Sequence, residues 1–162
     1  AVDALANGVR PPADDALIPR HATRQVAIAL ADTPVVMVNG PRQCGKTTLV
    51  RGLLRAAGVK EAVKSPTYTL VEVHVVSGLN FYHFDFYRFN DPLEWEEAGF
   101  REYFNQDSIC LVEWPEKAGE FLHAADLEIR ISYSGTRRIA EFSAATEAGE
   151  QCLSHWQKRV SD

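Results

Sequence analysis

The sequence predicts an α/β fold: a three-layer sandwich around a mixed, largely parallel sheet that also carries antiparallel hairpins. Two short apolar runs, 35–38 and 109–112, have the composition of strands buried on both faces, which is typical of parallel sheets. The first run is followed by a segment with helical spacing, and two pairs of alternating segments predict hairpins. Strands alternating with helices indicate the α/β class.

Residues 35–48 read V-V-M-V-N-G-P-R-Q-C-G-K-T-T. Gly40 permits a sharp turn out of the apolar run, and Gly45 opens the helix. The spacing is that of a G-x-x-x-x-G-K-[ST] P-loop, in which backbone N–H groups and a helix N-terminus surround a polyphosphate. The predicted fold is therefore P-loop NTPase-like. The loop residues expected to bind the nucleotide are Gly40, Cys44, Gly45, Lys46, Thr47 and Thr48.

Two side chains of this loop have specific expected roles. Lys46 places a positive charge near the β and γ phosphates, and the Thr47 hydroxyl is expected to ligate Mg²⁺. The alternative is a glycine-rich turn followed by a chance Lys-Thr pair. We favour the P-loop because strand, loop and helix occur in the required order, and Gly58 is a plausible end for the helix.

Length and composition favour a single domain. The chain has 162 residues, of which 46% are hydrophobic, so it can bury one substantial core. Residues 1–20 contain three prolines and two adjacent aspartates without a sustained period, and we expect an irregular lead-in there. Residues 21–162 are expected to form one P-loop domain, which begins with a packing helix over 21–31.

Charge and cysteine content exclude several classes of function. The formal net charge of -5 argues against tight unaided binding to a nucleic-acid backbone. Cys44, Cys110 and Cys152 are odd in number, widely spaced and in no C-x-x-C pair, which argues against disulfides or structural zinc. No apolar run approaches the roughly 18 residues of a spanning helix. We therefore expect a soluble cytoplasmic protein with no membrane association.

The loop at 59–69 and the hairpin after it supply further candidates. K-S-P-T-Y-T at 64–69 predicts an extended loop, in which Thr67 is a candidate switch residue that responds to the γ-phosphate. An ordinary polar connection is the alternative. Residues 70–76 and 81–85 predict an antiparallel hairpin, and its second strand ends in Asp85. A carboxylate in that position is a candidate Mg²⁺ ligand.

A second buried strand also ends in an acid. Residues 109–112 are apolar and lead into Glu113, Trp114 and Pro115, where proline favours the start of a helix. In P-loop NTPases the acid after such a strand holds Mg²⁺ or its water, so Glu113 is the Walker B candidate. Trp114 fills the core or lies beside the nucleotide.

The remaining segments are expected to complete the fold. A helix is expected over 93–104, with Glu94, Glu96 and Glu97 on a solvated face. A second hairpin is expected from 126–133 and 137–143, and a C-terminal helix over 144–160.

Residues 45–142 resemble the bacterial TsaE family, the small ATPases of tRNA threonylcarbamoyladenosine biosynthesis. The resemblance rests on five blocks in the family's order and spacing. They are G-K-T-T-L-V-R-G-L-L-R at 45–55, V-K-S-P-T-Y-T-L-V-E at 63–72, Y-H-F-D-F-Y-R at 82–88, E-E-A-G-F-R-E-Y-F at 96–104 and I-C-L-V-E-W-P-E-K-A-G at 109–119.

The resemblance implies a P-loop ATPase domain with ATP and Mg²⁺ as cofactors. The implied catalytic residues are Glu113, Asp85 and Thr67, and the implied metal ligands are Thr47, Glu113 and Asp85. Lys46 binds phosphates by this likeness, and Trp114 follows the Walker B acid beside the nucleotide. The implied function is ATP hydrolysis that supports a TsaD and TsaB complex, which forms N6-threonylcarbamoyladenosine (t6A37) in tRNA. The tRNA itself is expected to be contacted only indirectly.

Two other functions remain open. I-P-R-H at 18–21 and the loop G-P-R-Q-C-G-K-T resemble the start of AAA-like ATP-binding proteins, whereas TsaE proteins usually carry an acidic loop such as G-D-L-G-A-G-K-T. An AAA-like protein of unknown substrate is therefore one alternative. A nucleotide-gated adaptor with incidental turnover is the other. We expect slow hydrolysis without a partner, because Arg42 is the only arginine obviously near the phosphates, unless Arg88 or Arg101 folds back.

Overall fold

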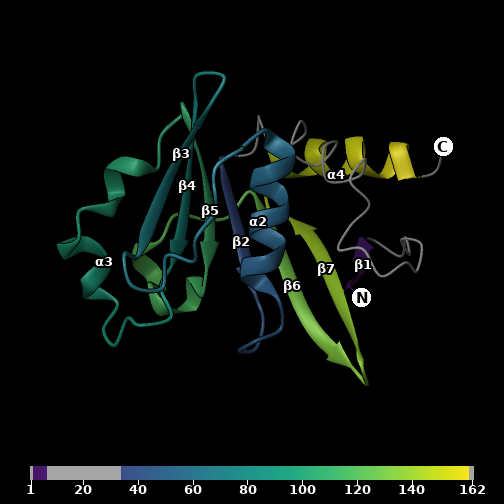
Figure 1. Cartoon of the computed structure of the whole chain (residues 1–162), viewed down its shortest axis with the longest axis horizontal. Helices are drawn as coiled ribbons and strands as arrows, with labels where there is room; N and C mark the ends of the chain where they lie inside the picture. Colours follow the sequence, from purple (N-terminus) through teal and green to yellow (C-terminus); the bar gives the residue numbers. More distant parts are fainter. Residues whose placement is uncertain (1, 7–33, 161–162) are drawn as a thin grey trace.

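A computed structural model of the protein describes residues 2–6 and 34–160, with side chains described over 34–155. The described chain forms a seven-stranded sheet in the order β1-β7-β6-β2-β5-β4-β3 (Figure 1). The strand bounds are Val2–Ala6 for β1, Val35–Asn39 for β2, Val71–Val76 for β3, Leu79–Asp85 for β4, Ser108–Glu113 for β5, Leu127–Ser134 for β6 and Arg137–Ala144 for β7.

The sheet is mixed and largely parallel, as predicted. Strand β2 lies parallel to both β5 and β6, β4 lies parallel to β5, and β1 lies parallel to β7. The pairs β3–β4 and β6–β7 are antiparallel hairpins. In this register Val38 pairs with Glu113, and Glu113 pairs with Asp85 on its other side. The two acids therefore lie side by side at the carboxyl ends of their strands, where β2 leads into the P-loop.

Helical layers cover the two faces of the sheet, which confirms the three-layer arrangement. On one face α2 (Lys46–Ala57) and α4 (Glu147–Val160) share a core with the even-numbered residues of β2. On the other face an aromatic cluster packs beneath the short helices α3 (Leu93–Glu97), η1 (Phe100–Tyr103), η2 (Pro115–Lys117) and η3 (Gly119–Phe121). Figure 1 shows α2 in front of the middle of the sheet, between β2 and β6 in this view.

Both predicted hairpins are confirmed, and their turns have clear local causes. Ser77 and Gly78 adopt φ values of 51° and 83°, and two consecutive positive φ values join β3 to β4 tightly with the right-handed twist of the strands. Gly135, with a φ of 60°, serves the turn from β6 to β7. The predicted end of α2 at Gly58 is also confirmed, since Gly58 is left-handed and donates to the Leu54 and Arg55 carbonyls.

The prediction of one helix over 93–104 is wrong. The chain leaves α3 after Glu97, and Gly99 adopts a left-handed φ of 70° before the 3₁₀ helix η1 begins. This break carries Phe100 into the aromatic cluster, where its ring centroid lies 5.3 Å from that of Phe84. Burial of that ring outweighs the local preference for a continuous helix, which the sequence pattern alone expresses.

The N-terminal region differs in part from the expected irregular lead-in. Residues Val2–Ala6 form β1 and pair in parallel with β7. The helix expected over 21–31 lies outside the described residues. The C-terminal helix is confirmed as α4, and Cys152 and Leu153 of its predicted stripe are buried. Among the helices of the described chain, none has both the length and the apolar character needed to cross a bilayer.

Candidate nucleotide and metal site

The P-loop follows β2 and is shaped by two glycines. Gly40 has a φ of 149°, and a Cβ atom there would lie 2.5 Å from the Ile131 carbonyl oxygen and 2.8 Å from Cys44 Sγ. Such contacts are too short for any side chain, so the loop approaches β6 as closely as it does only because residue 40 is glycine. Gly45 is left-handed, with a φ of 102°, and caps the N-terminus of α2. The first N–H groups of a helix have no partner within it, so this terminus is where a P-loop is expected to receive an anion.

Lys46 is buried and is held by the loop itself. Its Nζ donates to the carbonyl oxygens of Gly40 and Pro41 at 2.6 and 2.7 Å, and it lies 3.9 Å from the ring centroid of Trp114. A buried ammonium needs such partners because desolvation otherwise penalises its charge. Lys46 also lines the pocket, where a phosphate group would compete with the two carbonyls for its ammonium.

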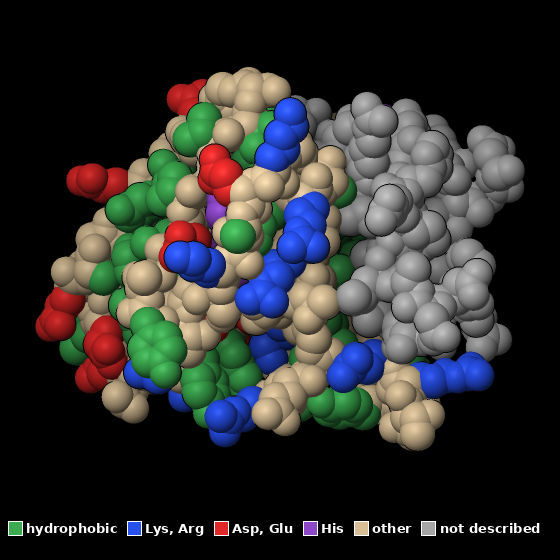
Figure 2. All heavy atoms as spheres, in the orientation of Figure 1, with side chains coloured by type: hydrophobic (Ala, Val, Ile, Leu, Met, Phe, Trp, Pro, Cys, Tyr) green, Lys and Arg blue, Asp and Glu red, His purple; other side chains and the backbone are tan. Residues whose placement is uncertain are grey.

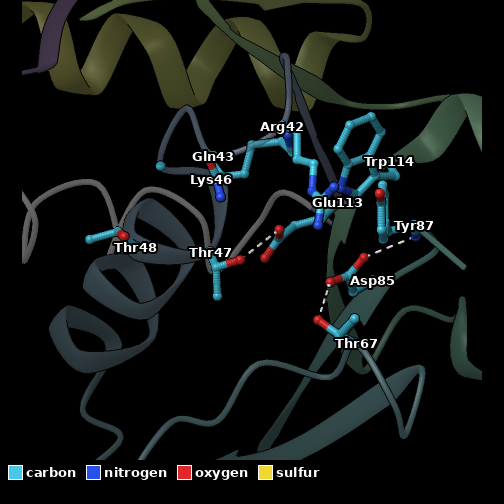
Figure 3. Close-up of a pocket in the computed structure, with 11 residues that line it drawn as sticks. Arg42, Gln43, Lys46, Thr47, Thr48, Thr67, Asp85, Tyr87, Glu113 and Trp114 are labelled. Atoms are coloured by element: carbon cyan, nitrogen blue, oxygen red, sulfur yellow. Dashed lines mark hydrogen bonds between the residues drawn. The ribbon is translucent and has the colours of Figure 1, made fainter.

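Thr47 and Glu113 come from different elements and meet directly. The Thr47 hydroxyl donates to Glu113 Oε2 at 2.9 Å, and Glu113 is only 2% exposed (Figure 3). Glu113 Oε1 lies 2.7 Å from Nε2 of His83, which is fully buried. The parallel pairing of β2 with β5 brings the Walker B candidate to the start of α2. This contact is the one that a shared Mg²⁺ site requires.

Asp85 and Thr67 form the second polar contact of the site. The Thr67 hydroxyl donates to Asp85 Oδ2 at 3.0 Å and is also 2.8 Å from the Ser65 hydroxyl. The Tyr87 backbone N–H donates to Asp85 Oδ1 at 3.0 Å, so both carboxylate oxygens have partners (Figure 3). The candidate switch loop is therefore fastened to the acid at the end of β4.

These residues surround one pocket of about 350 Å³. Its lining residues are Arg42, Gln43, Gly45, Lys46, Thr47, Thr48, Thr67, Asp85, Tyr87, Glu113 and Trp114. Of the residues predicted to form the site, only Gly40 and Cys44 are not among them. The Cys44 side chain is fully buried in the core beneath the loop, so a contact between this residue and a nucleotide would have to use its backbone.

Sequence reasoning missed two residues of the site, Tyr87 and Gln43, and noted Arg42 only as the arginine of the loop. Tyr87 lines the pocket with its ring centroid 5.1 Å from that of Trp114, and Arg42 lies 5.3 Å above the Tyr87 ring. Gln43 lines the pocket from the loop. The signal for Tyr87 is its place two residues after Asp85. The signal for Gln43 is that it occupies one of the variable positions of the P-loop, which lie beside the phosphates.

The two arginines considered for a role in cis do not line the pocket. Arg101 pairs with Glu96 at 2.7 Å and lies over Trp95, a member of the aromatic cluster. Arg88 stacks on the exposed ring of Tyr68 at 4.0 Å, next to the candidate switch residue. Arg42 is thus the only arginine among the described residues that lines the pocket.

The donor set fits Mg²⁺ bound together with phosphates. Mg²⁺ prefers hard oxygen ligands and is usually held by one or two carboxylates, with water and substrate phosphate completing its sphere. Thr47 and Glu113 offer a hydroxyl and a carboxylate in contact, and Asp85 adds a second carboxylate to the same pocket. Within residues 34–155 no three His, Cys, Asp or Glu side chains cluster as an independent metal cage. The site therefore suits a metal that arrives with a nucleotide.

Charge and burial around the site are uneven. Figure 2 shows Lys and Arg side chains running across the face that α2 covers, although the whole chain has a net charge of -5.

His74 on β3 is buried, and the pKa of His74 lies below its usual 6.5, chiefly because burial disfavours the charged form. The neighbouring His83 lowers this pKa further, while Glu61 and Glu72 act in the opposite direction.

Comparison with known proteins places the chain in one family. A family model described as "Threonylcarbamoyl adenosine biosynthesis protein TsaE" matches residues 18–140. The match includes 18–44, the segment whose motifs resemble AAA-like proteins. The tRNA threonylcarbamoyladenosine biosynthesis protein TsaE of Haemophilus influenzae is 48% identical over 120 residues, which cover 74% of this chain and 76% of that protein.

Two further relatives support the same assignment. The protein of the same name from Streptomyces coelicolor is 37% identical over 114 residues, covering 69% of this chain and 77% of that protein. The crystal structure of YdiB from Bacillus subtilis superposes with a TM-score of 0.66 at 28% identity, covering 88% of this chain and 91% of that one. Family model, sequence relatives and fold agree, and the chain belongs to the TsaE family of threonylcarbamoyl adenosine biosynthesis proteins.

Proposed function

We propose that the protein binds ATP with Mg²⁺ and hydrolyses it in support of N6-threonylcarbamoyladenosine formation in tRNA, acting in the cytoplasm with TsaD and TsaB. The observation that carries this proposal is the 2.9 Å contact between the Thr47 hydroxyl and Glu113 at the end of a P-loop. A P-loop alone binds phosphate. A buried acid in contact with the Thr hydroxyl of the loop adds the pair of oxygen ligands that a Mg²⁺ site for phosphoryl transfer needs.

The residues of this chain have separable tasks in that reaction. The backbone N–H groups at the start of α2 receive the phosphates, and Lys46 exchanges its two loop carbonyls for phosphate oxygens. Thr47 and Glu113 would hold the metal, and Glu113 or Asp85 would orient the attacking water. When bound, Mg²⁺ neutralises charge on the phosphates during transfer.

The site also contains a route by which a partner can act on it. Thr67 links the loop at 59–69 to Asp85, and the next residue, Tyr68, is 80% exposed and stacked against Arg88. A protein that docks on this exposed ring will shift Thr67 and hence the acid. Since Arg42 alone among the described arginines lines the pocket, turnover of the isolated protein is expected to be slow.

The same exposed loop favours a second candidate, a nucleotide-gated adaptor in which ATP sets the shape of a docking surface and hydrolysis is incidental. In either case tRNA is reached through the partner proteins, because the net charge of -5 does not favour direct binding to RNA. Binding to TsaD and TsaB in ATP, ADP and a non-hydrolysable analogue separates the candidates. An adaptor binds equally with ATP and the analogue and keeps its function when hydrolysis is blocked.

Two variants test the proposed enzyme. Lys46→Ala removes the phosphate charge and should weaken ATP binding, whereas Glu113→Ala disturbs the metal and water and should mainly lower turnover. Calorimetry and phosphate release on both variants measure the two effects. The proposal fails if Lys46→Ala binds ATP as tightly as the unaltered protein, or if Glu113→Ala releases phosphate at the same rate.

A further inference from the structure

His83 lies behind the proposed metal site and has no assigned role. It is on β4, two residues before Asp85, so its side chain projects from the same face of the sheet as that acid. The imidazole is fully buried, and Nε2 lies 2.7 Å from Glu113 Oε1. The contact joins neighbouring parallel strands, because β4 pairs with β5 through this stretch.

The hydrogen bonds of Glu113 fix the direction of this contact. A carboxylate only accepts, and its second oxygen, Oε2, already accepts from the Thr47 hydroxyl at 2.9 Å. His83 must therefore donate from Nε2. Its other ring nitrogen, Nδ1, has no hydrogen-bond partner among the described residues, so Glu113 is the only polar group there that orients the ring.

We propose that His83 is a positioning residue for Glu113: by donating Nε2–H to Oε1 it fixes the carboxylate with Oε2 turned toward Thr47. This inference rests on the proposed function, because it gives Glu113 its working orientation. A carboxylate that is 2% exposed has little water to replace a lost donor. Without His83 it turns away from the Thr47 hydroxyl, and the oxygen meant for the metal is misplaced.

Three substitutions separate this role from simple core filling. In His83→Gln the side-chain amide carries its N–H donor at about the same distance from the backbone as Nε2. In His83→Asn the side chain is too short for its amide to reach Glu113, and in His83→Phe an aromatic ring is kept but the donor is lost. If His83 only fills space, phenylalanine will be the best replacement. If it positions Glu113, glutamine will be the best.

The first measurement is steady-state phosphate release with saturating Mg²⁺, together with binding of a non-hydrolysable ATP analogue in EDTA. His83→Phe and His83→Asn should lose about 10–100-fold in kcat, the range found when the hydrogen-bond partner of a metal ligand is removed. Their affinity in EDTA should stay unchanged, and His83→Gln should recover most of the loss. Equal kcat values for the glutamine and phenylalanine variants, or a comparable loss of analogue affinity in EDTA, overturns the inference.

A second measurement does not depend on nucleotide and decides the case if the variants do not fold. Nitrogen NMR of the unaltered, nucleotide-free protein should show a proton on Nε2 of His83, with the chemical shift that a hydrogen bond to Glu113 gives this nitrogen. In Glu113→Ala that hydrogen bond is lost, so the chemical shift of Nε2 should change. A proton on Nδ1 alone, or an unchanged Nε2 signal in Glu113→Ala, overturns the inference. If instead the unaltered protein fails to bind Mg²⁺ and ATP, the proposed function fails while the NMR result still stands.

Discussion

Replacing Gly40 by alanine tests how the P-loop is fastened to the sheet. The added Cβ would lie 2.5 Å from the Ile131 carbonyl oxygen and 2.8 Å from Cys44 Sγ, and the backbone oxygen has no freedom to move away. The φ of 149° is also one that L residues rarely adopt. Backbone strain of about 1–3 kcal/mol and overpacking of about 1–3 kcal/mol together predict a loss of about 2–6 kcal/mol in the free energy of unfolding.

Gly135 offers a matched control in the turn from β6 to β7. Its φ is 60°, but no atom lies within 4 Å of an added Cβ, so alanine there introduces backbone strain without a clash. That strain alone is worth about 1–2 kcal/mol. Urea denaturation measures both variants, and calorimetry should show weakened ATP binding for Gly40→Ala only. Equal losses of stability in the two variants would refute the argument that close approach to Ile131 requires glycine.

Three further outcomes follow from the described contacts. Because the pKa of His74 is lowered in the folded protein, His74 gains its proton at a higher pH in the unfolded chain, so the free energy of unfolding should fall as pH drops below 6.5. Urea denaturation at pH 7.5 and 5.5 should show a smaller fall for His74→Phe than for the unaltered protein. Burial raises the pKa of the Cys110 thiol to about 12, so alkylation at pH 8 with peptide mapping should label it only after unfolding. Thr67→Val removes the hydroxyl that binds Asp85 and should reduce stimulation by a partner more than ATP affinity, whereas equal reductions would contradict a switch role.

Local features of the site were predictable because each is determined by a few neighbouring residues. The P-loop needs Gly40 and Gly45 at a fixed spacing, and the structure shows close approach or positive φ at both. The acids Asp85 and Glu113 were found as the last residues of strands, and parallel register brings such ends together. The two hairpins and the end of α2 at Gly58 follow from the same kind of local pattern.

What escaped prediction depends on contacts across the sheet. The partner of His83 becomes visible only once β4 and β5 are paired, because imidazole in a strand is equally compatible with simple core packing. Gly99 breaks a segment with good helical spacing because the aromatic cluster offers Phe100 more burial than a continued helix would. Pairing of β1 with β7 joins residues more than 130 positions apart, and no local pattern in 1–20 indicates it.

The most direct test of the proposed function is steady-state phosphate release with and without the TsaD and TsaB pair. A group supplied in trans is worth about 10³–10⁵ in rate in P-loop proteins, so even partial completion of the site is measurable. We predict slow release by the isolated protein, clear acceleration by the pair, and no acceleration for Glu113→Ala. Rapid release by the isolated protein that the pair leaves unchanged would contradict the proposed partnership.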